Sequence, residues 1–359
     1  MSAPGRIHAF DWLRGVAVVV MIQTHSLVLL QKALEKDALY PWLVRIDGLV
    51  APSFIFSAGF ALALVQVRAA IAQASRKAQA LKTLKRIGEV LLVASIVNAI
   101  WFRAFREPKW FLRIDILHCI GLSLLIALPF LVLLSSRPQV LRWMMLGLAA
   151  LVFGMSPLLE NVDGVASIFV NTRAGAIDET IGTTFPLFPW AGYVFLGASF
   201  GATVGMMKEE RQLWRWLALL WGLGVALWAT DAWWRSVYPP HNFWVTNPAN
   251  AAQRWTLVLS VVALFRVVEV RRPSSPKSKL AALVGTFGAS SLSAYFFHEM
   301  LLYEWHVGIF TKLFREKCDW VTYWPVLAAL ILCTWLCVKL WERVDPKLRA
   351  LFTRKPVTS

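Results

Sequence analysis

Apolar runs long enough to cross a membrane constrain the fold of this chain more than any other feature. A helix needs about 20 mostly apolar residues to cross roughly 30 Å of hydrocarbon. The 359-residue sequence contains ten such runs, near residues 12–31, 46–67, 86–103, 112–134, 139–157, 185–207, 213–233, 253–270, 282–305 and 320–342. Hydrophobic residues make up 58% of the chain, against about 45–50% in soluble domains. We therefore expect an all-α polytopic membrane protein, a bundle of about ten transmembrane helices that forms one domain over residues 1–359.

The distribution of charge predicts the orientation in the bilayer. The net charge is +16, and basic residues gather after the second, sixth and eighth runs and in the C-terminal tail. The loops after the fifth and seventh runs are acidic or nearly uncharged. Because cytoplasmic loops carry an excess of Lys and Arg, we expect both termini in the cytoplasm and the protein in a bacterial inner membrane. A nucleic-acid binder would spread its basic residues through a soluble fold, so no nucleic-acid partner is expected.

The cysteines give no sign of a metal site. Four are present, Cys119, Cys318, Cys333 and Cys337, and none forms a CxxC pair or a Cys/His metal-binding spacing. Three of them lie in apolar runs, where cysteine packs as a small hydrophobic residue. The sequence therefore predicts no metal ligands.

Ionisable side chains inside apolar runs mark functional sites by default, because they are costly in hydrocarbon. Arg14 and His25 are eleven residues apart in the first run, which places both on one helical face, roughly 16 Å apart along the axis. With the N-terminus inside, Arg14 lies near the cytoplasmic surface and can extend to it. His25 lies about two-thirds of the way across, too deep for an imidazole to reach water by the same extension.

The predicted topology places further ionisable groups in the same outer half of the bilayer. His118 follows Asp115 by one helical turn, Asp47 opens the second run, and His298 lies deep in the ninth with Glu299 beside it. These side chains could line one cavity with His25. The alternative for each histidine is an ordinary hydrogen bond between helices.

A basic cluster lies at the opposite, cytoplasmic level. It consists of Arg68, Arg76, Lys85 and Arg86, beside the expected inner end of the first span and Arg14. Such a cluster binds anionic lipid headgroups. It can equally hold the phosphates of a cytoplasmic cofactor, since arginine offers paired donors to phosphate.

Several motifs in order along the chain resemble a known family. "DWLRG" followed by "MIQTH" looks like the first span of transmembrane acyltransferases, and the spacing of Arg14 and His25 is similar to the signature of acyltransferase family three. The other landmarks resemble the bacterial branch of the heparan-alpha-glucosaminide N-acetyltransferase catalytic-domain family more closely. They are "APSFIFSAGFALAL", "RIDILHCIGLSLLIA", "FPLFPWAGYVFLGASFG", "TNPAN" and "SLSAYFFHEMLLY".

This resemblance implies a membrane enzyme of ten or eleven helices that passes an acetyl group from cytoplasmic acetyl-CoA to a glycan or aminosugar on the far side. One branch of the family has its catalytic histidine between the first two spans. Here that stretch, "SLVLLQKALEKDALYPWLVRIDG", contains no histidine. The resemblance therefore carries the catalytic role to His25 alone, and the acceptor is left open between a hydroxyl and an amine.

Acetyl transfer is the function that we expect from these features. His25 would act as general base, since a neutral imidazole titrates near pH 6.5 and suits proton transfer at neutral pH. Asp47, Asp115, His118 and His298 are the other candidate catalytic groups, and Arg14, Arg76, Lys85 and Arg86 would hold acetyl-CoA. A proton-coupled transporter that uses the same His and Asp residues is the alternative, and a scaffold whose histidines only link helices is a third reading. Whether the chain acts alone or as a homodimer is left open.

Overall fold

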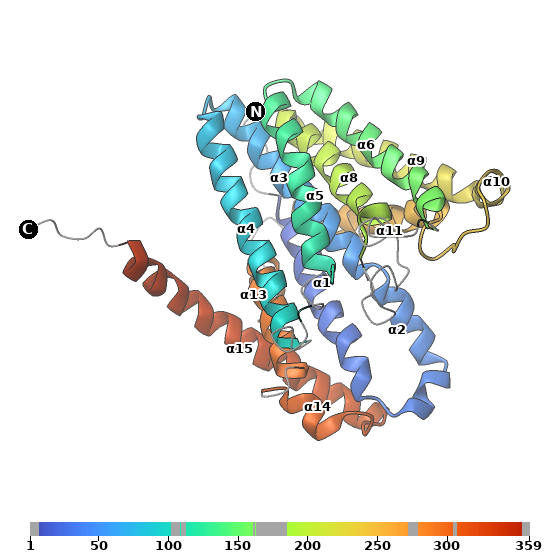
Figure 1. Ribbon diagram of the computed structural model, residues 1–359, viewed down its shortest axis with the longest axis vertical. Helices are drawn as coiled ribbons and strands as arrows, with labels where there is room; N and C mark the ends of the chain where they lie inside the picture. Colours follow the sequence, from blue (N-terminus) through green and yellow to red (C-terminus); the bar gives the residue numbers. More distant parts are fainter. Residues whose placement is uncertain are drawn as a thin grey trace, which may run out of the picture. The chain divides into compact units, whose positions relative to one another are not determined.

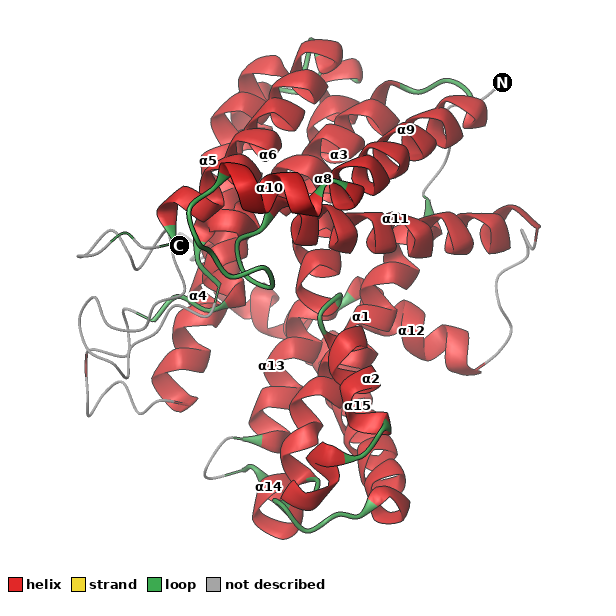
Figure 2. Ribbon diagram, turned by 90° about the vertical axis from the view of Figure 1, so that its right-hand side faces the viewer, coloured by secondary structure: helices red, strands yellow, loops and turns green. Residues whose placement is uncertain are grey.

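The computed structural model describes residues 7–101, 108, 113–160, 162, 185–271, 279–303 and 307–353. Within these ranges the chain is helical and no strand is present (Figure 2). A single backbone bridge, between Leu30 and Cys318, is the one extended pairing in the described part. The predicted all-α class is confirmed.

The helices follow the apolar runs (Figure 1). Their bounds are α1 His8–Ser26, α2 Leu39–Asp47, α3 Val50–Ile71, α4 Arg76–Trp101, α5 Ile116–Leu134, α6 Pro138–Leu159, α8 Leu187–Met206, α9 Glu210–Ala229, α10 Asp231–Val237, α11 Pro248–Arg271, α12 Lys279–Ala289, α13 Ser291–Leu302, α14 Ile309–Phe314 and α15 Trp320–Thr353. Two short 3₁₀ turns, Leu27–Leu29 and Lys32–Lys36, follow α1.

Seven helical segments of the described chain are long and apolar enough to cross a membrane. They contain α1, α2 with α3, α5, α6, α8, α11 and most of α15. A further pair, α9 and α10, passes the same test together but bends by 60°. The multi-pass membrane class is therefore confirmed, whereas the count of ten spans and the cytoplasmic termini stay predictions.

The ninth apolar run is interrupted. A single span was expected over residues 282–305, but α12 ends at Ala289 and α13 begins at Ser291. Only Ser290 lies between the two helices, and the sequence around it, "GTFGASS", is rich in Gly and Ser, a composition at which helices kink or break. The break separates a short α12 from α13, which carries His298 and Glu299.

The chain divides into two compact units, each of which we describe by itself. The first contains residues 1–13 and 48–273, and the second contains residues 14–47 and 274–359. That all of these residues form one acyltransferase domain stays a prediction.

Helix α8 is the interior helix of the first unit. In its most apolar window 83% of the residues are buried, against 33–50% in the other six candidate spans. It packs mainly against α3 and α6, and also against α5. Figure 1 shows these four helices side by side. Because lipid is as apolar as leucine, close backbone packing rather than water exclusion has to hold such a helix in place.

Glycines on α8 permit that close packing. A side chain at Gly197 would collide with the carbonyl group of Phe56 on α3, and one at Gly201 would collide with that of Phe60. The relation is mutual, because a side chain at Gly59 of α3 would collide with the Val194 carbonyl of α8. The repeat of small residues every four positions, "GASFGATVG", is thus the contact face of α8.

The first turn of α1 is also tied into the first unit. The carboxylate of Glu269 on α11 accepts hydrogen bonds from the backbone nitrogens of His8 and Ala9, at 2.8 and 3.2 Å. These nitrogens have no partner within the helix, and the positive end of the helix dipole favours a carboxylate there. Arg266 contacts the same carboxylate at 2.7 Å and that of Glu210 at 2.6 Å. The start of the helix that carries His25 is therefore fixed by a charged network.

Replacing Gly197 with leucine should destabilise the first unit, because overpacking a close contact costs about 1–3 kcal/mol. We expect a lower Tm and loss of monodispersity in detergent. Gly222→Leu in α9 is the matched control, since nothing lies within 4 Å of a side chain added there. Equal melting temperatures for the two variants would contradict close packing of α3 and α8.

Candidate active site

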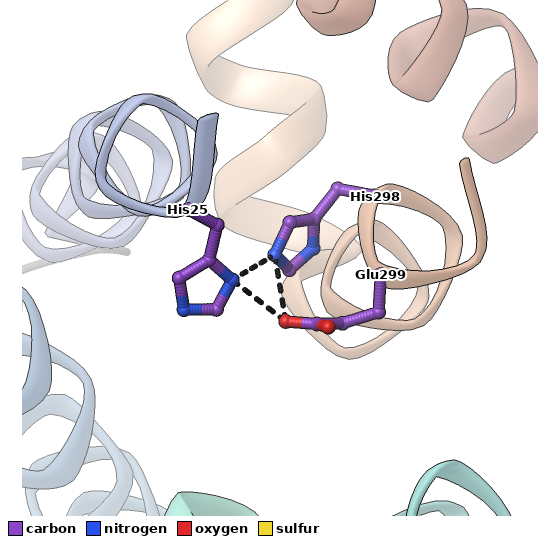
Figure 3. A group of neighbouring side chains, drawn as sticks. All are labelled: His25, His298 and Glu299. Carbon is purple, nitrogen blue, oxygen red and sulfur yellow. Dashed lines mark hydrogen bonds and ion pairs between the residues drawn. The ribbon is translucent and has the colours of Figure 1, made fainter. Parts of the chain in front are cut away.

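Three ionisable side chains meet inside the second unit (Figure 3). His25 Nδ1 lies 2.9 Å from His298 Nε2 and 2.7 Å from Glu299 Oε1. His298 Nε2 lies 3.2 Å from the same carboxylate oxygen. Two residues that the sequence placed at the same depth, His25 and His298, are thus brought together, and Glu299 joins them.

The three side chains differ in their access to solvent or lipid. The side chains of His298 and Glu299 are 0% and 1% exposed, whereas that of His25 is 30% exposed. A buried carboxylate costs several kcal/mol unless it is paired, so the imidazole of His25, 2.7 Å away, stabilises Glu299. His25 is therefore the most exposed member of the group.

The contacts determine which nitrogen of His25 can act as a base. His298 donates from Nδ1 to the Ala294 carbonyl one turn earlier, at 3.1 Å, which leaves its Nε2 directed at His25 and Glu299. The 2.7 Å contact between His25 Nδ1 and Glu299 needs a proton between the atoms, and with the carboxylate ionised that proton is on Nδ1. In that tautomer Nε2 is the unprotonated nitrogen of the His25 ring. This is the arrangement in which a carboxylate orients a histidine base in catalytic triads.

Two tyrosines hold the end of α1 that carries His25. The Tyr303 hydroxyl donates to the His25 carbonyl at 2.8 Å. The Tyr323 hydroxyl lies 2.8 Å from Ser26 Oγ and 3.2 Å from the Gln23 carbonyl. The last carbonyls of a helix have no partner within it, and here tyrosines that follow α13 or belong to α15 supply the donors. The backbone that bears His25 is thereby fixed in position.

The turn after α1 is bound to the segment before α15. Gln31 N donates to the Cys318 carbonyl and Cys318 N to the Leu29 carbonyl, each at 3.0 Å. Trp320 Nε1 donates to Asp37 at 2.7 Å. Asp319 starts α15 by accepting from Thr322 N at 2.8 Å, and hydrogen bonds from Thr322 lower the pKa of this exposed carboxyl. Segments far apart in the sequence therefore form one support for the site.

Asp47, a predicted site residue, also belongs to the second unit. It ends α2, is half-buried, and interacts with the Thr24 hydroxyl and electrostatically with His25. Its contact with His25 is less direct than that of Glu299.

Asp115 and His118 belong to the first unit and cap the start of α5. Asp115 accepts from Ile116 N at 2.8 Å, and Asp115 N donates to His118 Nδ1 at 3.5 Å. The pair forms a reciprocal capping box, which satisfies backbone donors that the helix leaves open. This gives both residues a structural task, and their part in the chemistry stays a prediction.

The predicted donor-binding residues lie on α1 and α4. Arg14 is half-buried on α1, whereas Arg76, Lys85 and Arg86 are exposed on α4. Arg76 donates to Ser136 at 2.7 Å. Their role in binding stays a prediction.

Glu299 is the site residue that sequence reasoning did not rank as catalytic. A signal for it is present, because "HEM" places an acid beside a histidine within an apolar segment. Adjacent residues on a helix point about 100° apart, so spacing alone did not predict that both would face His25.

His25, His298 and Glu299 are also the residue types that bind zinc. The distances between their donor atoms can be compared with those expected around a zinc ion and with those of hydrogen-bonded or ion-paired contacts. Ligands of a tetrahedral zinc ion with bonds of about 2.0 Å lie about 3.3 Å apart. The separations here are 2.7, 2.9 and 3.2 Å. All are shorter; the 2.9 Å contact between the imidazoles is a hydrogen bond, and the two contacts with Glu299 are ion pairs. The geometry therefore fits proton sharing better than metal coordination.

Chelation should accordingly leave the protein unchanged. We expect substoichiometric zinc by elemental mass spectrometry and the same Tm before and after treatment with EDTA. Retention of about one zinc ion per chain, lost in a Glu299→Gln variant, would contradict the hydrogen-bonded reading.

A comparison with known families supports the resemblance of the motifs. The model of the heparan-alpha-glucosaminide N-acetyltransferase catalytic domain matches residues 6–229, more than half of the chain. The match includes His25 and ends before His298 and Glu299. No curated protein matched the chain. With its apolar helices and this match, the chain belongs to the heparan-alpha-glucosaminide N-acetyltransferase catalytic-domain family, a family of membrane acetyltransferases.

Proposed function

We propose that the chain is a membrane-embedded acetyltransferase that moves an acetyl group from cytoplasmic acetyl-CoA to a sugar hydroxyl or amine on the extracytoplasmic side of a bacterial inner membrane. The observation that carries this proposal is the pairing of His25, which is 30% exposed, with the buried carboxylate of Glu299 at 2.7 Å. A histidine that a carboxylate orients in this way is suited to act as a general base.

In the proposed reaction His25 carries one proton from the acceptor to the departing sulfur. His25 Nε2 takes the proton from the acceptor N–H or O–H while that atom attacks the thioester carbonyl. A new N–C or O–C bond forms and the C–S bond breaks. The imidazolium then returns the proton to the departing sulfur. Glu299 stabilises the transient positive charge, and this matters most where the local dielectric constant is low.

The donor would be held at its phosphates by arginine and lysine. Arg76 and Lys85 are nine residues apart on α4, roughly 13.5 Å along the helix, and Arg86 follows directly. These exposed side chains, with Arg14 on α1, suit a ligand with several separated phosphate charges. We propose Asp47 as a second negative group near His25, and Asp115 with His118 as candidates on the acceptor side.

His25→Ala should abolish most of the transfer activity. General base catalysis typically contributes about 10²–10⁴-fold, so we expect a fall in kcat of at least about 100-fold, measured as release of free CoA thiol with an added acceptor. His8→Ala is the matched control, because His8 is an exposed histidine at the start of the same helix. Near-normal activity of His25→Ala would remove this residue from the mechanism.

Glu299→Gln should lower kcat about 10- to 1,000-fold while the KM for acetyl-CoA stays within about twofold, since the carboxylate acts on His25 rather than on the donor. Glu299→Asp should recover part of the activity. A rise in KM at constant kcat would instead assign Glu299 to donor binding. Unfolding temperatures of the variants show whether any loss reflects folding.

A proton-coupled carrier is the second candidate, because a buried group of two imidazoles and a carboxylate also suits proton relay. Acceptor-dependent release of CoA thiol by purified protein supports the enzyme. Proton-driven uptake into proteoliposomes without consumption of acetyl-CoA supports the carrier.

A further inference from the structure

A basic cavity lies in the first unit, apart from the residues assigned above. It has a volume of about 410 Å³ and is formed where α8 ends and where α6 and α9 begin. Its polar lining includes Arg142, Arg215, Gln139 and Gln212. Every one of these side chains carries an N–H donor, so the cavity suits an acceptor-rich, negatively charged group.

Arg142 is held in place by aromatic rings. Its guanidinium carbon lies 5.1 Å from the ring centre of Trp143 and 5.1 Å from that of Trp216. The Ser199 hydroxyl on α8 donates to the Arg142 carbonyl at 2.8 Å and fixes the backbone. Aromatic contacts orient a guanidinium without using its N–H groups. Arg142 Nε is buried and has no hydrogen-bond partner among the described residues, which leaves a donor for a ligand.

The described part of the chain places no carboxylate in the lining of this cavity. Glu210, in the first turn of α9, is engaged by Arg266 at 2.6 Å. Two arginines therefore give the cavity a positive charge that an anion would balance.

The rest of the lining is apolar, and it distinguishes a lipid from a soluble anion. Met206, Trp216 and Leu219 also line the cavity, and Trp143 beside it is 52% exposed. Tryptophan is enriched where hydrocarbon meets the headgroups, and the cavity lies at the ends of three helices. Basic pockets between transmembrane helices at this level bind anionic headgroups. A soluble phosphate would leave the methionine and leucine side chains without a partner.

We propose that this cavity binds an anionic phospholipid, with the phosphate at Arg142 and Arg215 and the upper part of an acyl chain along Met206 and Leu219. The proposal is independent of the acetyl-transfer reaction, because it uses none of the residues assigned to that site.

The test measures lipid retained by the full-length protein. Wild-type protein, reconstituted in nanodiscs of phosphatidylglycerol mixed with phosphatidylcholine, is released into detergent and analysed by native mass spectrometry. We expect about one phosphatidylglycerol to be retained per chain and no phosphatidylcholine. Each arginine should contribute about fivefold in affinity for the lipid, the factor that corresponds to about 1 kcal/mol per basic residue near an anionic headgroup.

Arg215→Gln is the first variant, because Arg215 is exposed on α9 and its loss leaves the packing intact. Arg142→Lys is the second, since lysine keeps the charge but loses the paired planar donors. Both should retain less phosphatidylglycerol. Arg211→Gln is the matched control, because Arg211 is exposed on the same helix and does not line the cavity; it should retain lipid as the wild type does.

Two outcomes would overturn the proposal. One is equal loss of lipid in Arg211→Gln and Arg215→Gln, which indicates non-specific attraction to the surface. The other is displacement of the lipid signal by soluble adenosine 3′,5′-bisphosphate at micromolar concentration, which identifies a nucleotide phosphate site. The acetyltransferase activity of the same variants is measured in parallel. Failure of the lipid proposal can then be distinguished from failure of the proposed acetyl transfer.

Discussion

The carboxylate of Glu299 is the group on which the arrangement of the site depends. It is 1% exposed, and an ionised carboxylate in such surroundings is stable only when positive or hydrogen-bonding groups face it. His25 on α1 supplies such a group to Glu299 on α13, at 2.7 Å. The pairing therefore links α1 to α13 and, in the proposed reaction, orients His25 as the base. The His25 imidazole cannot turn away from α13 without taking the 2.7 Å partner from the carboxylate.

Hydrogen bonds to the last backbone carbonyls of α1 also hold His25 in place. Helix α1 ends at Ser26, next to His25, so its last carbonyls need donors from outside the helix. Tyr303 provides one to His25, and Tyr323 lies against Gln23 and Ser26. A hydrocarbon environment offers no water for these carbonyls. The position of His25 is therefore fixed through its own backbone as well as through its side chain.

The two units use different means of holding helices together. In the first unit, glycines at 197 and 201 allow α8 to approach α3 at backbone distance, and the small side chains leave few polar groups to satisfy. In the second unit, side-chain hydrogen bonds and ion contacts join α1, α13 and α15. Dispersion contacts suit a tightly packed interior helix. Polar contacts suit a site, since they set the direction of individual donors and acceptors.

The apolar runs by themselves determined that this chain is a helical membrane protein, because the length of a run reflects the thickness of the bilayer. The eleven-residue spacing determined that Arg14 and His25 share a face, because helical geometry is local. The sequence pattern does not determine which side chains on other helices these residues contact. Only the tertiary structure decided that His25 meets His298, 273 residues away, and Glu299 beside it, while Asp115 and His118 cap α5. Apolar periodicity restricts which face of a helix is buried, but the rotation and depth of one helix against another follow from side-chain packing between segments far apart in the sequence.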